Sequence, residues 1–150
     1  MALEKILLAV GPNDKDRVEE LARTVIDIAG PTGAEVTVAH VFTEDQYEDV
    51  VDRLEFASTG EADPDEVADR HTTVRDLSNR LEEAGIVHSA RGAVGNHGDQ
   101  IVSLAEDTGA DLVVVGGRKR SPTGKAVFGS TAQEVMLNAP CPVTFVRGEE

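Results

Sequence analysis

Apolar residues along this chain fall into short runs that alternate with helically spaced sets. Within those sets, apolar residues recur at intervals of three and four, which indicates amphipathic helices. The sets begin near Val18, Val67, Ile101 and Ala132. The apolar run 112–115 is unbroken, which is typical of a strand buried on both faces of a parallel sheet. The runs predicted as strands are residues 5–10, 35–41, 86–91, 112–115 and 143–146.

The order of these elements predicts an α/β fold. Strands that alternate with helices form a parallel sheet with helices on both faces, and the crossovers are right-handed. We therefore expect an open five-stranded parallel sheet of the Rossmann-like kind. No internal repeat or second domain is apparent, so a single domain is expected over residues 1–150, with its core at about 4–147. Ligands of such sheets bind beyond the carboxyl ends of the strands, where the strand order reverses.

Turn-forming residues predict where several elements end. Gly30-Pro31 is expected to stop the first helix, and one continuous second helix is expected from Pro64 or Asp65 to Ala84. Residues 92–96 are expected to form a turn. Residues 43–65 are acidic, and they are expected to form a mobile, irregular surface loop with at most a helical turn near Val50.

The charge balance excludes some classes of partner. The chain carries 28 acidic and 14 basic residues, which gives a formal net charge of −14. Nucleic acids and anionic membrane surfaces are bound through clustered cations, so neither is expected as a partner. Repulsion among so many like charges destabilises a compact state unless salt screens it. We interpret the composition as adaptation to a salty, halophilic cytoplasm, with an ordinary acidic protein as the alternative.

The sequence also bears on the cellular compartment. No apolar run approaches the roughly 20 residues that a membrane span needs. No secretory signal is expected, because charged Glu4 and Lys5 precede an apolar run that is too short for one. Cys141 is the single cysteine, which excludes an internal disulfide and fits a reducing cytosol. A cytoplasmic protein is therefore expected.

A glycine-rich basic segment follows the run at 112–115 and leads into the last helix. Four of the 14 basic residues lie close together there: Arg118, Lys119, Arg120 and Lys125. Ser130 or Thr131 is expected to cap the helix by accepting a bond from its first free N–H groups. Those N–H groups, the helix dipole and the cations all favour an anion, so we interpret the segment as a phosphate-binding loop. A solvated loop that is cationic by chance is the alternative.

The segment does not match the two commonest phosphate-binding patterns. The P-loop needs a glycine, four residues, and then Gly-Lys-Ser/Thr. Gly124 and Lys125 are present, but Lys119 stands at the position of the first glycine and Ala126 follows the lysine. The dinucleotide pattern Gly-x-Gly-x-x-Gly follows no predicted strand.

The spacing does resemble the nucleotide loop of the universal stress protein family, Gly-x2-Gly-x9-Gly-Ser/Thr. Gly116, Gly129 and Ser130 match this pattern. The resemblance extends from about Glu4 to Arg147, and it includes the opening strand, the strand end at His40-Val41 and the segment 138–143. It implies the strand order 3-2-1-4-5, with ATP or AMP as ligand, with or without magnesium.

The resemblance also implies which residues form the nucleotide site. Ala9 and Val41 would flank the purine, and Gly116 and Gly129 would let the backbone approach the phosphates. The full implied set is Ala9, Val10, Gly11, Val41, Val115, Gly116, Arg118, Lys119, Gly129, Ser130 and Thr131. Two of these depart from the family pattern. Gly11 stands where the family commonly has an aspartate that meets the base or ribose, and Lys119 replaces the second glycine.

The implied function is a nucleotide-binding stress-response or signalling module without rapid turnover. Two alternatives remain open: a dimeric interaction protein of the same fold that has lost the nucleotide, and a slow ATP hydrolase. The resemblance further implies a homodimer joined through the last strand, whose edge would otherwise be unpaired. That strand consists of Val143, Thr144, Phe145 and Val146. The protein partner is unknown.

Other patterns that would indicate catalysis or metal binding are absent from the sequence. The four histidines accompany no cysteine cluster, so no tightly bound metal is expected. His40 is interpreted as a packing residue, whereas His97 is a candidate ligand contact. No Gly-x-Ser-x-Gly elbow is present and no pair of acids stands out, so no catalytic residue is assigned.

Overall fold

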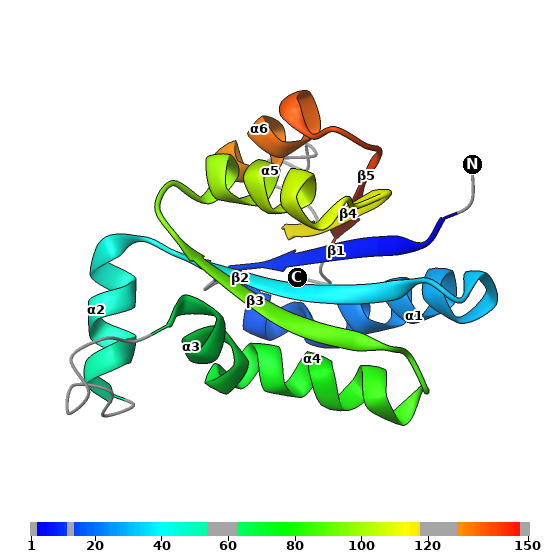
Figure 1. The fold of residues 1–150 in the computed structure, drawn as a ribbon, viewed down its shortest axis with the longest axis horizontal. Helices are drawn as coiled ribbons and strands as arrows, with labels where there is room; N and C mark the ends of the chain where they lie inside the picture. The colour runs from blue at the N-terminus through cyan, green and yellow to red at the C-terminus, as the bar shows by residue number, and fades with distance from the viewer. Residues whose placement is uncertain (1–2, 12–13, 54–62, 118–128, 148–150) are drawn as a thin grey trace, which may run out of the picture.

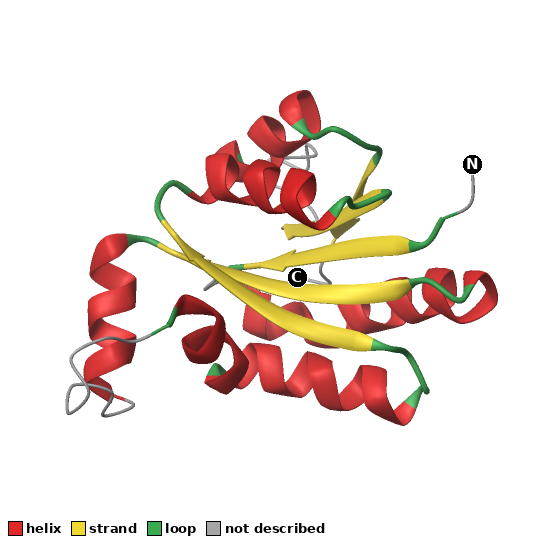
Figure 2. Ribbon diagram, in the orientation of Figure 1, coloured by secondary structure: helices red, strands yellow, loops and turns green. Residues whose placement is uncertain are grey.

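Five parallel strands form the centre of the molecule. The computed structural model describes residues 3–11, 14–53, 63–117 and 129–147. The strands lie in the order β3-β2-β1-β4-β5, which confirms the predicted topology. Figure 2 shows them as one twisted sheet with helices on both sides. The strands are β1 (Lys5–Val10), β2 (Glu35–Phe42), β3 (His88–Val94), β4 (Leu112–Gly117) and β5 (Val143–Arg147).

Helices cover both faces of this sheet. Figure 1 shows α1 (Val18–Thr32), α3 (Pro64–Arg70) and α4 (Thr72–Glu83) on one face, and α5 (His97–Thr108) and α6 (Ser130–Asn138) on the other. A short 3-10 helix, η1 (Asp14–Arg17), leads into α1, and α2 (Glu44–Arg53) stands beyond the carboxyl end of β2. Within the described ranges, no helix combines the length and apolar character that a membrane crossing requires.

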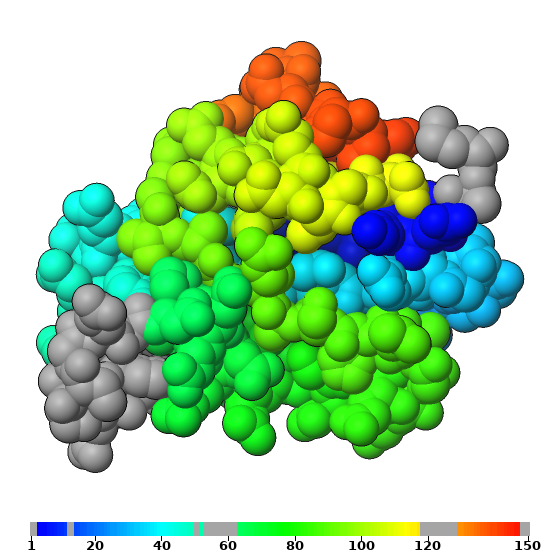
Figure 3. Space-filling model, in the orientation of Figure 1, coloured from blue at the N-terminus to red at the C-terminus, as the bar shows by residue number. Residues whose placement is uncertain are grey.

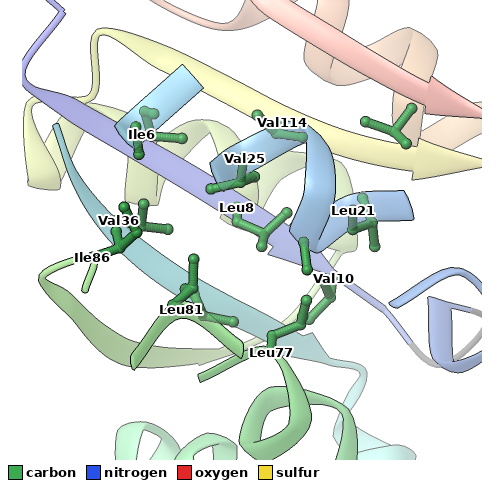
Figure 4. Packing of buried hydrophobic residues seen from close by; sticks show 14 of the residues in the cluster. Ile6, Leu8, Val10, Leu21, Val25, Val36, Leu77, Leu81, Ile86 and Val114 are labelled. Atoms are coloured by element: carbon green, nitrogen blue, oxygen red, sulfur yellow. The ribbon is translucent and has the colours of Figure 1, made fainter. Parts of the chain in front are cut away.

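The apolar runs form strands because both of their faces are buried. In β1, Ile6 and Leu8 pack toward α1 and α4, whereas Leu7 and Ala9 pack toward α5 and α6. All four side chains are at most 3% exposed. Burying a side chain of this size contributes about 1.5–3 kcal/mol. The core on the α1/α4 face is drawn in Figure 4, where Leu21 and Val25 of α1 project onto β1.

The helices cover the two faces of the sheet, and the edge at β3 is only partly covered. In Figure 3 the green helices α3 and α4 lie below and the yellow-green helix α5 lies above, with blue and cyan atoms visible between them. The structure therefore places polar chemistry at the ends of the strands rather than on the faces of the sheet.

The first helix is longer than predicted. Gly30 and Pro31 were expected to stop α1, yet the helix continues to Thr32. It ends at Gly33, which adopts the left-handed conformation (φ 72°) and donates its N–H to Ala29 O at 2.9 Å. Pro31 is tolerated because the chain leaves the helix only two residues later, so few helical bonds depend on it.

The predicted helix from about 64 to 84 is instead two helices. His71 interrupts it with an extended backbone (φ −68°, ψ 136°), and its side chain caps α4 by accepting the N–H of Thr73 at 3.3 Å. The predicted turn at 92–96 is also displaced, because β3 continues through Gly92 to Val94. Gly92 fits there because a Cβ at this position would lie 2.0 Å from Pro64 O, so only glycine lets α3 approach the strand.

The acidic segment after β2 is more ordered than predicted. Helix α2 occupies Glu44–Arg53, where an irregular loop was expected. Thr43 and Gln46 form a reciprocal capping box, in which each side chain accepts the backbone N–H of the other residue at 3.2 and 2.8 Å. Residues 54–62, the middle of the predicted mobile loop, lie outside the described residues.

Candidate functional site

The strand order reverses between β1 and β4, which lie side by side in the sheet. Ala9 pairs with Val115, so Gly11 after β1 and Gly116 near the end of β4 emerge at the same edge. We call this place the switch point. Strand β4 continues two residues beyond its predicted end, because Gly116 and Gly117 pair with Val146 and Arg147 of β5. Open α/β sheets bind ligands at such points.

The apolar residues predicted to flank the nucleotide converge on one face. Ala9, Val41 and Val115 belong to the core shared with α5 and α6, and they are 3%, 1% and 4% exposed. Ala132, from the first turn of α6, packs in the same cluster. Val10 instead faces the core under α1 and α4. The structure thus joins three of the four predicted apolar positions and places the fourth on the opposite side of the sheet.

The α1 side of Gly116 is occupied by a buried ion pair, which we call the Asp14/Arg17 pair. Asp14 and Arg17 are 8% and 5% exposed, and Arg17 Nε lies 3.2 Å from Asp14 Oδ1. A Cβ on Gly116 would lie 2.9 Å from Arg17 Cδ and 3.1 Å from Asp14 Oδ1. Gly116 therefore lacks a side chain at a point where these two residues leave no room for one.

The same pair is bonded to the turn after β1. Asp14 Oδ2 accepts the N–H of Gly11 at 2.7 Å, and Asp14 donates its own N–H to Gly11 O at 3.1 Å. Burial raises the pKa of the Asp14 carboxyl, although the hydrogen bond from Gly11 and the charge of Arg17 both oppose that rise. Asp14 thus supplies a carboxylate near the family's aspartate position, but one directed to the backbone and to Arg17.

The other face of the β4 end is packed against β5. A Cβ on Gly117 would lie 2.5 Å from Phe145 Cζ, so the Phe145 ring takes the space that a side chain at 117 would need. Phe145 also packs against the core under α5 and α6. Both glycines of the β4 end are therefore required by neighbouring protein side chains, one on each face of the sheet.

The helix that was expected to hold a phosphate begins at Ser130, and its N-cap is Gly129. The prediction that Ser130 or Thr131 caps this helix was wrong, because both lie inside its first turn and Gly129 supplies no side-chain cap bond. Gly129 O accepts the first helical bond, from Gln133 N at 3.0 Å. The N–H groups of Ser130, Thr131 and Ala132 precede that bond and so have no acceptor within the helix.

None of the described residues crowds this helix start. A Cβ on Gly129 would meet nothing within 4 Å, and Gly129 and Ser130 are exposed. Free N–H groups at an open helix N-terminus favour an anion. The predicted cations Arg118, Lys119, Arg120 and Lys125 lie outside the described residues.

His97, the predicted additional ligand contact, is the first residue of α5. Its Nε2 lies 3.3 Å from Gln46 Oε1, so the two side chains bridge α5 and α2. Burial lowers the pKa of His97, which favours the neutral ring. Among the described residues, no three His, Cys, Asp or Glu side chains are grouped so that they would hold a metal ion.

Sequence reasoning missed the Asp14/Arg17 pair. Of the residues that follow the first strand, only Gly11 was assigned to the site from the sequence. The spacing of three between an acid and a base at a helix start was the available signal, since such residues face each other. What the sequence did not reveal is the burial, which depends on Gly116 in a distant strand.

The sequence of this chain is similar to that of a known protein family. The sequence model of the universal stress protein family matches residues 2–147. A universal stress protein of Mycolicibacterium smegmatis is 33% identical over 92 residues, which cover 61% of this chain and 71% of that protein.

Solved structures show the same fold. A universal stress protein from Archaeoglobus fulgidus superposes with a TM-score of 0.70 at 28% identity, covering 96% of this chain and 98% of that one. The structure of the universal stress protein from Archaeoglobus fulgidus in complex with dAMP has a TM-score of 0.66 at 24% identity, covering 98% of this chain and 100% of that one.

Proposed function

Because the chain belongs to the universal stress protein family, we propose that it is a nucleotide-binding module of stress response or signalling that holds AMP or ATP without rapid turnover. One observation carries the proposal. The first turn of α6, whose N–H groups have no acceptor within the helix, packs into the same cluster as the three apolar residues at the carboxyl ends of β1, β2 and β4. Donors for a phosphate thus lie beside the apolar residues of these strand ends at the switch point.

In this proposal the phosphates lie at the start of α6. Gly129, Ser130 and Thr131 would present backbone donors, and Arg118 and Lys119 would add positive charge. The base would lie toward Ala9, Val41 and Val115. A structure of the same fold in complex with dAMP supports an adenine nucleotide as the ligand class. Any magnesium ion would arrive with ATP, since Mg²⁺ is commonly held through the phosphates of its nucleotide.

The role of Asp14 supports slow or absent turnover. Hydrolysis needs a carboxylate or an equivalent group that orients a water molecule. Asp14 lies beside Gly116, but its two oxygens are directed to the Gly11 N–H and to Arg17. This carboxylate is therefore a structural group at the switch point, and we propose no catalytic residue.

We further propose that the protein acts in the cytoplasm as a homodimer joined through β5. Strand β5 lies at the end of the sheet order, so its outer edge pairs with no other strand of the described chain. A two-fold axis would bring Val143, Thr144, Phe145 and Val146 against their copies in antiparallel pairing.

Analysis of freshly purified protein tests the proposal. We expect absorbance near 260 nm, as adenine gives, together with a nucleotide that elutes on chromatography after denaturation. Calorimetry with AMP and ATP in high salt should then show saturable binding at one site per chain. A parallel assay with ATP and magnesium should show little phosphate release. Protein that carries and binds no nucleotide would favour the second candidate, a dimeric interaction protein. The differences from the family's nucleotide-site pattern at Gly11 and Lys119 support this candidate.

A further inference from the structure

Asp14 is bonded to the turn after β1 and is paired with Arg17 of η1. Its Oδ2 accepts the N–H of Gly11 at 2.7 Å, and its backbone N–H returns a bond to Gly11 O at 3.1 Å. Its Oδ1 lies 3.2 Å from Arg17 Nε. The two hydrogen bonds join Gly11 to η1, and the ion pair lies within η1.

The pair also contacts the other side of the switch point. The position of a Cβ on Gly116 would be 2.9 Å from Arg17 Cδ, 3.1 Å from Asp14 Oδ1 and 3.3 Å from Leu21 Cδ2. Arg17 and Asp14 therefore rest directly on the backbone of β4. The loop after β1 and the end of β4 are in contact through these two side chains.

Burial distinguishes this pair from the other ion pairs of the described chain. Side chains of the pairs Arg23/Glu19, Arg70/Glu66 and Arg80/Asp76 are all more than 40% exposed. The side chains of Arg17 and Asp14 are 5% and 11% exposed. Burying an ion pair adds little net stability on average, because the desolvation of both charges offsets their attraction. A role in geometry accounts for its place better than a role in stability.

We propose that the Asp14/Arg17 pair is a positioning device of the nucleotide site: it holds the turn after β1 against Gly116 and so sets the spacing of the two loops between which the ligand lies. On this proposal a glycine is needed at position 116 because it leaves space for the side chains of Asp14 and Arg17 as well as for a phosphate. The ligand named here rests on the proposed function, whereas the contact of Asp14 and Arg17 with the end of β4 does not.

The chain contains a matched control for this arrangement. Asp65 Oδ1 accepts the N–H of Gly92 at 2.7 Å and lies 3.3 Å from Arg91 Nε. Like Asp14, it accepts the N–H of a glycine and is ion-paired with an arginine, here at β3 on the sheet edge. The side chains of Arg91 and Asp65 are 39% and 44% exposed, and strands β2 and β1 lie between this pair and β4.

The first experiment needs no ligand. Amide NMR spectra are recorded in high salt for the full chain and for Asp14→Ala, Asp14→Asn and Asp65→Ala. We expect Asp14→Ala to move the amide signals of both Gly11 and Gly116. Asp14→Asn should move the Gly11 signal less, because its amide oxygen still accepts the bond. Asp65→Ala should move the Gly92 signal and leave Gly116 in place. An unchanged Gly116 signal in Asp14→Ala would overturn the proposal.

A second variant covers the case in which Asp14→Ala does not fold. Gly116→Ala introduces a methyl group against the pair from the β4 side, with no change of charge. We expect it to move the amide signal of Gly11, although the two residues are 105 positions apart in the chain (116 − 11). A Gly11 signal that stays in place would equally refute the coupling.

Calorimetry with AMP then measures the effect on binding. We expect Asp14→Ala to bind about tenfold more weakly, the scale of one lost hydrogen bond to a charged group. Asp14→Asn should recover most of that loss, and Asp65→Ala should bind like the unmodified protein. AMP binding by Asp14→Ala that equals the unmodified protein contradicts a positioning role. If the unmodified protein binds no AMP, the proposed function fails, while the NMR result still decides whether the pair couples the loops.

Discussion

The imidazole ring of His40 lies against that of His71, with ring centroids 4.2 Å apart and the rings tilted by 38°. His40 is 2% exposed, and neither of its ring nitrogens has a hydrogen-bond partner in the described part of the chain. Phe42 stacks on the same ring at 4.3 Å. Burial, and then the proximity of His71 and His97, lowers the pKa of His40 to about 3. The ring is therefore neutral in the folded protein at neutral and mildly acidic pH.

This relationship predicts acid sensitivity. The pKa of His40 is about 3 when folded and 6.5 ordinarily, so the unfolded chain takes up a proton first as the pH falls. The stabilising effect of the neutral ring is complete above pH 6.5 and is lost progressively toward pH 3. We expect the free energy of unfolding to fall by up to about 1.4 kcal/mol per pH unit in that window. Urea unfolding in high salt at several pH values between 7 and 5 measures this slope.

A variant isolates the contribution of His40 from the carboxylates that titrate nearby. His40→Leu removes the titrating group and leaves no polar atom unpaired, so its stability should vary less steeply with pH. His88→Gln serves as the control, because His88 lies at the opposite end of the sheet with its Nδ1 2.9 Å from Ile86 O. Equal slopes for His40→Leu and the unmodified protein would refute the assignment.

The net charge of −14 predicts a strong dependence on salt. Like charges on the folded surface repel, and screening shortens that repulsion from about 10 Å at 0.1 M salt to about 3 Å at 1 M. We expect the melting temperature to rise steeply between these conditions. Sucrose at equal osmolality is the control, since it adds no screening. A melting temperature that is constant from low to molar salt would contradict the interpretation of the sequence as halophilic.

The sheet was predictable because its signals are local. The run of residues 5–10 is apolar at Ile6 to Val10 and becomes a strand buried on both faces. Gly109 closes α5 in the left-handed conformation (φ 65°), at the position where the apolar spacing stops. In both cases neighbouring residues in the sequence determine the outcome, so the sequence alone is sufficient.

The errors in the predicted helices and strands arose where contacts with residues distant in the sequence determine the local structure. His71 divides one predicted helix into two, and at this break its ring contacts His40 of the distant strand β2. Gly92 is part of a strand rather than a turn, because the Pro64 backbone packs against it. Helix α2 is the exception. Its capping box Thr43-Glu44-Asp45-Gln46 is a local signal that was outweighed by the acidic composition.

Part of the candidate site was predictable because its signals are also local. Gly116 and Gly129 stand out in the sequence as a glycine after an apolar run and a glycine before a helix, and the structure places them near the carboxyl ends of the strands. The Asp14/Arg17 pair was not predictable, because its burial requires Gly116 and Leu21 around it. Which residues touch a nucleotide stays a prediction.

That prediction can be tested at Gly129. The backbone there has φ −62° and ψ 162°, and a Cβ would meet nothing within 4 Å, so valine fits without strain. We expect Gly129→Val to keep its melting temperature and to bind AMP at least about tenfold more weakly, because its branched side chain blocks the approach to the helix N–H groups. Calorimetry measures the affinity. Gly30→Val in α1 is a control of the same kind, since it also meets nothing within 4 Å. Unchanged affinity in Gly129→Val would show that Gly129 is only the helix cap.

The geometry of β5 shows how the proposed dimer should be tested. Val113 pairs with Val143, and Val113 donates its N–H to Pro142 O at 3.0 Å. In a parallel ladder every second residue bonds to the same neighbour. Pro142, Thr144 and Val146 therefore direct their backbone groups toward β4, and the backbone groups of Val143 and Phe145 point outward. A proline at 144 would break the sheet within one chain, whereas a proline at 143 would alter only the outer edge.

We therefore predict that Val143→Pro converts a dimer into a monomer in high salt. Proline removes the outward N–H, which the antiparallel copy would need as a donor, and it is tolerated at the start of an edge strand. Val143→Ala keeps that N–H and loses side-chain packing, so it should remain a dimer of slightly lower stability. Thr144→Pro should lower the melting temperature strongly, because it removes a bond to β4. Light scattering gives the mass and thermal unfolding gives the stability. Val143→Pro with the mass of the unmodified dimer would place the interface elsewhere, since no outward donor at residue 143 would then be required.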